Sequence, residues 1–139
     1  MKIRIKATGF KLTDGIKALA EEKILAPLEK RLGRELGDDH IVDVELARET
    51  KHHVEGLIWR CEANIAIPHV NRTIYAMALS QSLEGAIDET KDEIEREAMD
   101  YKNKRSAKFL RLARRMKERV HITRLAQSAS DLYKWVRRR

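Results

Sequence analysis

Lys and Arg side chains crowd the C-terminal part of this sequence, and they are the groups best able to do chemistry in it. Residues 102–139 contain 14 Lys or Arg and 2 acidic residues, whereas residues 1–101 contain 15 Lys or Arg and 20 Asp or Glu. The two parts carry net charges of +12 and −5, which sum to the +7 of the whole chain. Because concentrated like charge repels itself, this pattern favours a polyanionic partner, nucleic acid ahead of an anionic membrane. A merely solvated helical face is the alternative explanation.

The spacing of the basic residues indicates how they would reach a nucleic acid. Phe109, Leu112, Met116 and Val120 recur at helical spacing among them, which predicts an amphipathic helix with a basic side. Arg and Lys bind phosphate through charge, with little base specificity and with an affinity that falls as salt rises. The phosphate-binding candidates in this segment are Lys108, Arg111, Arg114 and Arg115.

Two aromatic residues near the C-terminal end, Tyr133 and Trp135, stand among basic residues. An aromatic ring that stacks on an exposed base contributes about 1–3 kcal/mol. The competing interpretation is that both rings fold back onto the folded domain as a hydrophobic anchor. The sequence leaves the two interpretations open.

Residue types that catalyse reactions are present, but not in a catalytic pattern. His52 and His53 are adjacent, so in a strand they point to opposite faces, and no Asp or Cys stands at a metal-ligand spacing. Ser80, Ser82 and Asp88 lack the Gly-x-Ser-x-Gly turn of a nucleophile, and the sequence has no phosphate loop. Helix capping explains these three residues. We therefore expect no enzyme activity, no metal site and no cofactor.

The composition also predicts a cytoplasmic protein. No run approaches the roughly 18 apolar residues of a membrane span, and residues 1–6 alternate between polar and apolar types, unlike a signal peptide. Cys61 is the only cysteine, so the chain can form no internal disulfide and no Cys-based zinc site. We expect Cys61 to be a buried apolar residue.

Alternation of apolar and polar residues with a period of two predicts four strands. The strands are expected over residues 2–7, 42–47, 57–67 and 73–79. The polar residues 49–56 predict a long hairpin loop, and residues 68–72 predict a compact turn.

Helical spacing predicts a first helix over about residues 14–32, with Thr13 as its N-cap and Gly33 at its end. Pro27 removes one backbone hydrogen bond inside this helix. A kink or an irregular turn is therefore expected near Ala26.

A second helix begins after Ser80 or Ser82 and buries one face as far as Tyr101. It either continues into the basic segment or restarts at Ser106. The stretch after His121 is expected to be weakly helical with a free end.

These elements predict an α+β fold in the order β-α-β-β-β-α, with a four-stranded sheet and two helices packed on one of its faces. A basic, partly helical C-terminal extension follows the sheet domain. We place the domain at residues 1–105 and the extension at residues 106–139.

Several short segments occur in a defined order over about residues 1–105. They are Lys2-Ile3-Arg4-Ile5-Lys6, Leu12-Thr13, Leu28-Glu29-Lys30, Gly85-Ala86-Ile87-Asp88 and Tyr101-Lys102-Asn103-Lys104. Together with the order of elements, these segments resemble the ribosome hibernation promoting factor family, also called ribosome-associated inhibitor A. The most specific piece is Ala86-Ile87-Asp88 followed about four turns later by a lysine-rich helix end.

The resemblance implies a stress-period protein that binds rRNA in the decoding region of the small ribosomal subunit. It would exclude mRNA and tRNA and so inhibit translation by occupancy, without a small-molecule substrate. The rRNA contacts that the resemblance carries over by position are Lys23, Lys30 and Arg31 on the first helix and Lys91, Lys102, Lys104 and Arg105 on the second.

The sequence departs from the family in two places. Ser82-Leu83-Glu84 and Gly85 stand where the family usually has Asp-Met-Tyr before Ala-Ala-Ile-Asp. The second helix is also unusually acidic, and an acidic stretch cannot bind phosphate. Either this helix faces away from rRNA, toward a basic ribosomal protein, or the flanking basic residues take over the contacts; the charge distribution favours the second.

Long members of the family add a C-terminal β domain that pairs ribosomes. The 34 residues after Arg105 are too few and too polar for such a domain, so we expect a short-form member without a dedicated dimerisation domain. A general RNA-binding or RNA-chaperone module, with the α-β-β-β-α topology of a double-stranded-RNA-binding domain, is the alternative function. A protein-interaction module or enzyme subunit is a third, supported by the acidic helix alone.

Overall fold

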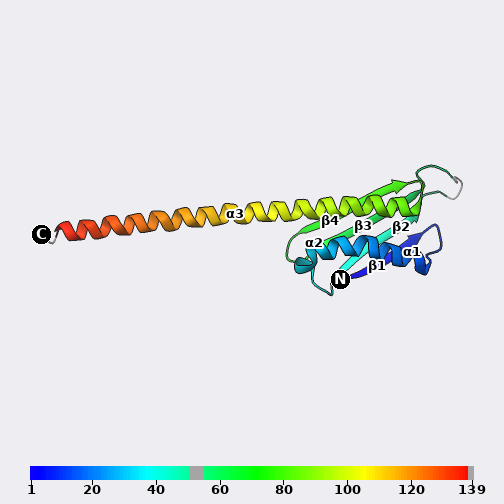
Figure 1. The fold of residues 1–139 in the computed structure, drawn as a ribbon, viewed down its shortest axis with the longest axis horizontal. Coiled ribbons are helices and arrows are strands. Elements are labelled where there is room, and N and C mark those ends of the chain that lie inside the picture. The colour runs from blue at the N-terminus through cyan, green and yellow to red at the C-terminus, as the bar shows by residue number, and fades with distance from the viewer. Residues whose placement is uncertain (51–54, 138–139) are drawn as a thin grey trace. The chain divides into compact units, whose positions relative to one another are not determined.

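The computed structural model describes residues 1–50 and 55–137 (Figure 1). Its elements in chain order are β1 (Lys2–Thr8), α1 (Asp14–Ala20), the π-helical segment η1 (Glu21–Leu25), α2 (Ala26–Leu36), β2 (Ile41–Arg48), β3 (Trp59–Ile67), β4 (Arg72–Ser80) and α3 (Leu83–Arg137). The α+β fold and the order of elements are those predicted from the sequence. His52 and His53, in the middle of the expected hairpin loop, lie outside the described residues.

The described strands form one four-stranded sheet in the order β1-β2-β3-β4. β1 runs parallel to β2, and the other neighbouring strands are antiparallel. Parallel neighbours need a crossover connection, and the helices between β1 and β2 provide it. Because side chains alternate between the two faces of a sheet, the apolar residues of β2 and β3 gather on one face. The buried ones are Val42, Val44, Leu46, Cys61, Ala63, Ile65 and Ile67.

The helices α1, η1, α2 and the first part of α3 cover this apolar face of the sheet (Figure 1). From the first helical layer, Ala20, Ile24, Leu28, Leu32 and Leu36 enter the core. From α3, the buried residues are Ala86, Ile87, Thr90, Ile94, Ala98 and Tyr101. The two helices therefore pack on one face, as predicted. On the opposite face β1, β2 and β3 place mainly polar side chains, whereas β4 exposes Tyr75, Met77 and Leu79.

The irregular turn expected near Ala26 is the π-helical segment η1, which ends immediately before Ala26 and Pro27. Pro27 has no N–H for the α-helical hydrogen bond to the carbonyl four residues earlier. The buried residues of this layer also follow one another at intervals of four, from Ala20 to Leu36. An α-helix has 3.6 residues per turn, so residues four apart are each displaced by about 40° around the helix axis. The wider turn of η1 takes up part of that displacement.

The prediction that Gly33 ends the first helix is wrong. α2 continues to Leu36, whose side chain is buried in the core, and Gly37 ends the helix with φ of 74°, in the left-handed region that glycine adopts readily. Burying Leu36 outweighs the weak helix propensity of a single interior glycine.

α3 continues through Ser106 without a break and is helical as far as Arg137, so the weak helix expected after His121 is in fact regular. Ser82 caps its N-terminus, since the Ser82 Oγ accepts a hydrogen bond from the Gly85 N–H at 3.0 Å. Thr13 does the same for α1 through the Ile16 N–H. By its internal contacts the chain divides into two units, residues 1–101 and residues 102–139.

Candidate nucleic-acid interface

The first unit offers only part of its predicted rRNA contacts to solvent. On α2, Lys30 is exposed and Arg31 is half-buried. Lys23, on η1, is half-buried and its Nζ lies 2.8 Å from Oδ1 of Asp88 on α3. The hydrogen bond with Asp88 and the charge of that carboxylate raise the pKa of Lys23. Lys23 therefore joins η1 to α3, and Asp88 competes with phosphate for its ammonium group.

The part of α3 that belongs to the first unit is acidic. Residues 83–101 contain eight Asp or Glu and two Lys or Arg, which gives a net charge of −6. Of the two basic residues, Lys91 is half-buried with its Nζ 3.9 Å from Asp92, and Arg96 pairs with Glu93. Both cations thus have a carboxylate nearby, and this part of α3 repels phosphate.

The second unit has the opposite character. We call its described residues, 102–137, the basic arm; they are helical and exposed throughout. They contain 12 Lys or Arg and 2 acidic residues, a net charge of +10. The predicted phosphate-binding residues of the arm are Lys102, Lys104, Arg105, Lys108, Arg111, Arg114 and Arg115, and each is exposed.

Helical geometry sorts these arm residues by direction. Lys104, Lys108, Arg111 and Arg115 are spaced by four, three and four residues, so they lie on one side of the helix over about 16 Å. Phe109, Leu112, Met116 and Val120 form a second side, which lies on average about 115° around the helix from the first. Lys102 and Arg105 fall toward that second side, and Arg114 lies at the edge of the first. The arrangement gives one basic ridge and one apolar ridge.

Tyr133 and Trp135 are 69% and 55% exposed on the arm. Successive residues of an α-helix are about 100° apart, so two residues separated by one other point in nearly opposite directions. The two rings therefore do not form one stacking platform, and each would meet a base separately.

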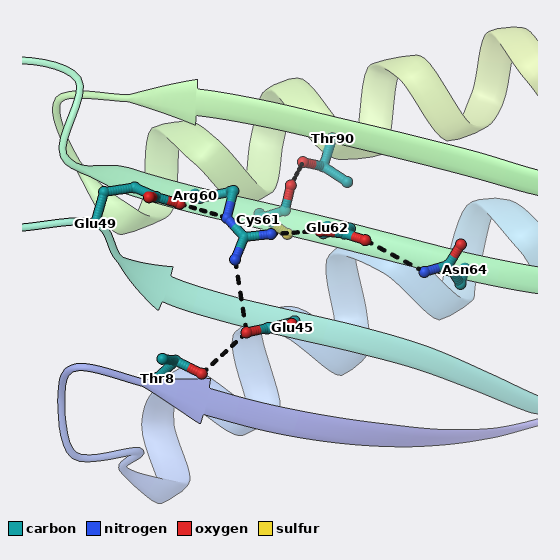
Figure 2. A network of polar contacts seen from close by, with 8 residues as sticks. All are labelled: Thr8, Glu45, Glu49, Arg60, Cys61, Glu62, Asn64 and Thr90. Carbon is teal, nitrogen blue, oxygen red and sulfur yellow. Dashed lines mark hydrogen bonds and ion pairs between the residues drawn. The ribbon is translucent and has the colours of Figure 1, made fainter.

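The polar face of β1, β2 and β3 holds an arginine network that was not predicted from the sequence (Figure 2). Arg60 of β3 contacts Glu49 at 2.5 Å, Glu45 at 3.6 Å and also Glu62. Burial lowers the pKa of Arg60, but the hydrogen bond with Glu49 and the charges of all three carboxylates outweigh this and raise the pKa overall. Alternation along β3 was the available signal, because it places Arg60 and Glu62 on the face opposite Cys61.

Two further polar contacts extend the arginine network on this face (Figure 2). Thr8 Oγ1 donates to Glu45 Oε1 at 3.0 Å, and Asn64 Nδ2 donates to Glu62 Oε1 at 3.4 Å. These contacts connect β1, β2 and β3 across the polar face. Arg60 is consequently held by carboxylates and stabilises the sheet.

Cys61 is buried on the core side of β3, as predicted. Burial raises the pKa of its thiol to about 11, although a hydrogen bond with Thr90 opposes the shift. Such a thiol stays protonated at neutral pH and is a poor nucleophile. Over residues 1–50 and 55–137, no cluster of three or more His, Cys, Asp or Glu side chains could hold a metal ion. Within the same part of the chain, no helix is both long and apolar enough to cross a membrane.

Two solved structures share the fold of the first unit. A ribosomal subunit interface protein from Coxiella burnetii is 19% identical, with a TM-score of 0.56 over 74% of this chain and 99% of its own. The N-terminal domain of Protein Y from Thermus thermophilus is 22% identical, with a TM-score of 0.55 over 73% of this chain and 99% of its own. At these identities the likeness establishes the fold. No curated protein sequence matches the chain.

The family model described as sigma 54 modulation protein / S30EA ribosomal protein matches residues 3–106. The match covers most of the chain, including all of the first unit after Lys2, and it stops within the first turns of the basic arm. The family resemblance inferred from the sequence is thereby confirmed: this chain belongs to the sigma 54 modulation protein / S30EA ribosomal protein family.

Proposed function

We propose that this protein binds the small ribosomal subunit in the cytoplasm through rRNA of the decoding region, and that it inhibits translation by blocking mRNA and tRNA. Membership of the S30EA family and the fold shared with a ribosomal subunit interface protein support a ribosomal partner. The observation that carries the proposal is the separation of charge within one helix, from −6 over residues 83–101 to +10 over residues 102–137. The role is one of binding, without catalysis.

The charge separation assigns different tasks to the two units. The first unit is net negative and ties Lys23 and Arg60 to carboxylates, so it contributes shape and a few exposed cations such as Lys30. The basic arm holds its cations exposed along a helix. Phosphate contacts by such cations provide most of the affinity of non-specific RNA binding. The arm is therefore the principal phosphate-binding element in this proposal.

Neutralising four of the predicted phosphate-binding residues of the arm tests this assignment. The variant carries Lys108→Gln, Arg111→Gln, Arg114→Gln and Arg115→Gln. Loss of four phosphate contacts should reduce the slope of log affinity against log salt concentration by about 3. Binding is measured by co-sedimentation with purified small subunits over a salt series, and inhibition by translation in vitro.

The matched control removes the same charge from the first unit, at exposed residues outside the proposed contacts. It carries Lys6→Gln, Lys11→Gln, Lys17→Gln and Arg34→Gln. The proposal expects a clearly smaller loss of slope and near-normal inhibition from this control. If the salt-dependence slope decreased equally in both variants, the net charge of the protein, and not the position of the charges on the arm, would govern binding.

The general RNA-binding alternative makes a different prediction in the same assay. The elements α2, β2, β3, β4 and α3 do follow the α-β-β-β-α order of a double-stranded-RNA-binding domain. That alternative expects equal affinity for duplex RNA and for small subunits, whereas a decoding-region factor binds the subunit preferentially. Migration of the protein away from ribosomes at low salt would refute the ribosomal proposal.

A further inference from the structure

The end of the basic arm carries a second apolar stripe that the proposed RNA contacts do not use. It consists of Ile122, Leu125, Ala129, Leu132 and Val136, at intervals of three, four, three and four residues. The four large side chains of this stripe are between 58% and 66% exposed. Alternating intervals of three and four residues are those of positions a and d in a heptad repeat.

This second stripe does not continue the apolar ridge of Phe109 to Val120. Ala129 lies 18 residues after Arg111, which is five full turns of an α-helix, so the stripe lies on the side of the basic ridge. The apolar residues before His121 and those after it thus lie on different sides of the arm helix. One flat partner surface cannot cover both apolar sides of a continuous helix, so the stripe needs a partner of its own.

The residue types at the heptad positions specify that partner. Ile122 and Val136 are β-branched residues at position a, and Leu125 and Leu132 occupy position d. This combination favours a parallel, two-stranded coiled coil. Ala129, between the two leucines, lets the helices approach closely. We propose that the stripe pairs with the same stripe of a second copy of this chain, in parallel and in register over about 22 Å of helix.

The charge pattern agrees with pairing between identical copies. Positions e and g, which flank a coiled-coil seam, hold Ala126, Ser128, Tyr133 and Trp135 here, all uncharged. Ser128 Oγ already donates to the Arg124 carbonyl at 3.0 Å, so its hydroxyl can be covered without losing a partner. Two stripes can therefore meet without like charges facing each other, even though the arm is strongly basic.

The apolar ridge from Phe109 to Val120 does not have uncharged residues on both sides. Lys117 and Arg119 flank it, so two copies paired along it would bring like charges together. In the stripe segment the charged residues Arg124, Asp131 and Lys134 point away from the seam, toward solvent. The basic ridge lies upstream on the same side of the helix, with Lys108, Arg111 and Arg115 at a and d positions of the same register. Repulsion between these like charges keeps the two helices apart there, so pairing is confined to the last two heptads.

The test measures self-association of the full chain without ribosomes, by sedimentation equilibrium over a concentration series. Leu125→Asp with Leu132→Asp should raise the dissociation constant of the dimer by at least about tenfold, because each carboxylate would be buried at the seam without a partner. The matched control, Thr123→Asp with Ser130→Asp, introduces the same charge on the opposite side of the helix. It should leave the dimer intact.

Cross-linking tests the register and the direction of pairing. In a Cys61→Val background, Ala129→Cys places a thiol at position a, where two parallel in-register copies bring both sulfurs together. Oxidation should then give a covalent dimer, whereas Asp131→Cys, at an outward position, should remain largely monomeric. Higher salt should strengthen the dimer by screening the two arms, while it weakens RNA binding.

A full chain that stays monomeric at all concentrations, with no cross-link at position 129, would overturn the proposal. So would equal loss of the dimer in the seam variant and its control. Stripe-dependent binding to anionic vesicles by a monomeric chain would assign the stripe to a lipid surface instead. The basic ridge is intact in every one of these variants, so failure of self-association is separable from failure of ribosome binding.

Discussion

At the scale of residues, Arg60 shows how neighbouring carboxylates can occupy a basic side chain that would otherwise be able to bind phosphate. Its side chain is 22% exposed and contacts three glutamates from two strands and a loop. Arg4 makes a pair of the same 2.5 Å length with Asp43, but its side chain is 70% exposed. A pair that is largely shielded from water loses more when one partner is removed, because the remaining charges are poorly solvated.

Arg60→Gln should therefore destabilise the protein by about 1–2 kcal/mol, through repulsion among the three glutamates that remain. Arg4→Gln, which also removes one arginine from the polar face, should have a clearly smaller effect. Urea denaturation at neutral pH gives both free energies of unfolding. Equal effects would show that the arginine network contributes no more than an exposed ion pair does.

At the scale of elements, the wide turn of η1 allows buried side chains spaced four residues apart to stay on the same side of the helix. Ala20 and Ile24 both face the sheet across the wide turn. If one residue is removed there, they become three residues apart, a spacing at which a regular α-helix still presents them on one face. The wide turn can thus lose a residue without rotating the rest of the layer.

Deletion of Glu22 in a Pro27→Ala background should give a regular helix and a protein that still unfolds cooperatively. Deletion of Lys30 in the same background shortens the chain equally but rotates Leu32 and Leu36 by about 100° away from the sheet. It should lower stability by several kcal/mol, because two leucines leave the core. Thermal unfolding followed by circular dichroism compares the two, and similar midpoints would contradict this account of η1.

At the scale of the molecule, folding and phosphate binding are allotted to different parts of the chain. All residues of the hydrophobic core cluster come from residues 1–101, with Tyr101 as its last buried member. The basic arm supplies charge and exposed apolar side chains. A unit with its own core can fold without the arm.

A chain that ends after Leu110 should therefore keep a cooperative transition, with a thermal midpoint within about 5 °C of the full chain. A chain that ends after Asp92 loses Ile94, Ala98 and Tyr101 from the core and should be unfolded. Differential scanning calorimetry distinguishes these outcomes. A large loss of stability in the longer truncation would mean that the arm contributes to the folded unit.

Much of the fold was predictable because it depends on local patterns. The alternation in β2 and β3 identifies their buried faces, and the intervals between Ile24, Leu28 and Leu32 identify the helical side that packs on the sheet. The charge reversal after Tyr101 is also a property of the sequence alone, and it led to the arm as a phosphate-binding element. The rRNA-contact assignments and the division of the chain at residue 105 stay predictions.

Tertiary structure determines the interactions between residues that are distant in the sequence. Asp88 pairs with Lys23, which lies 65 positions earlier in the sequence, and Arg60 contacts Glu45 only because β2 and β3 pair in one particular register. Local periodicity specifies which face a side chain occupies but not which partner lies opposite. Sequence alone thus determined that this protein has a folded acidic unit and a basic helical end. Only the packing of strands and helices decided which cations are held by carboxylates, because ion pairing depends on distances that no local pattern contains.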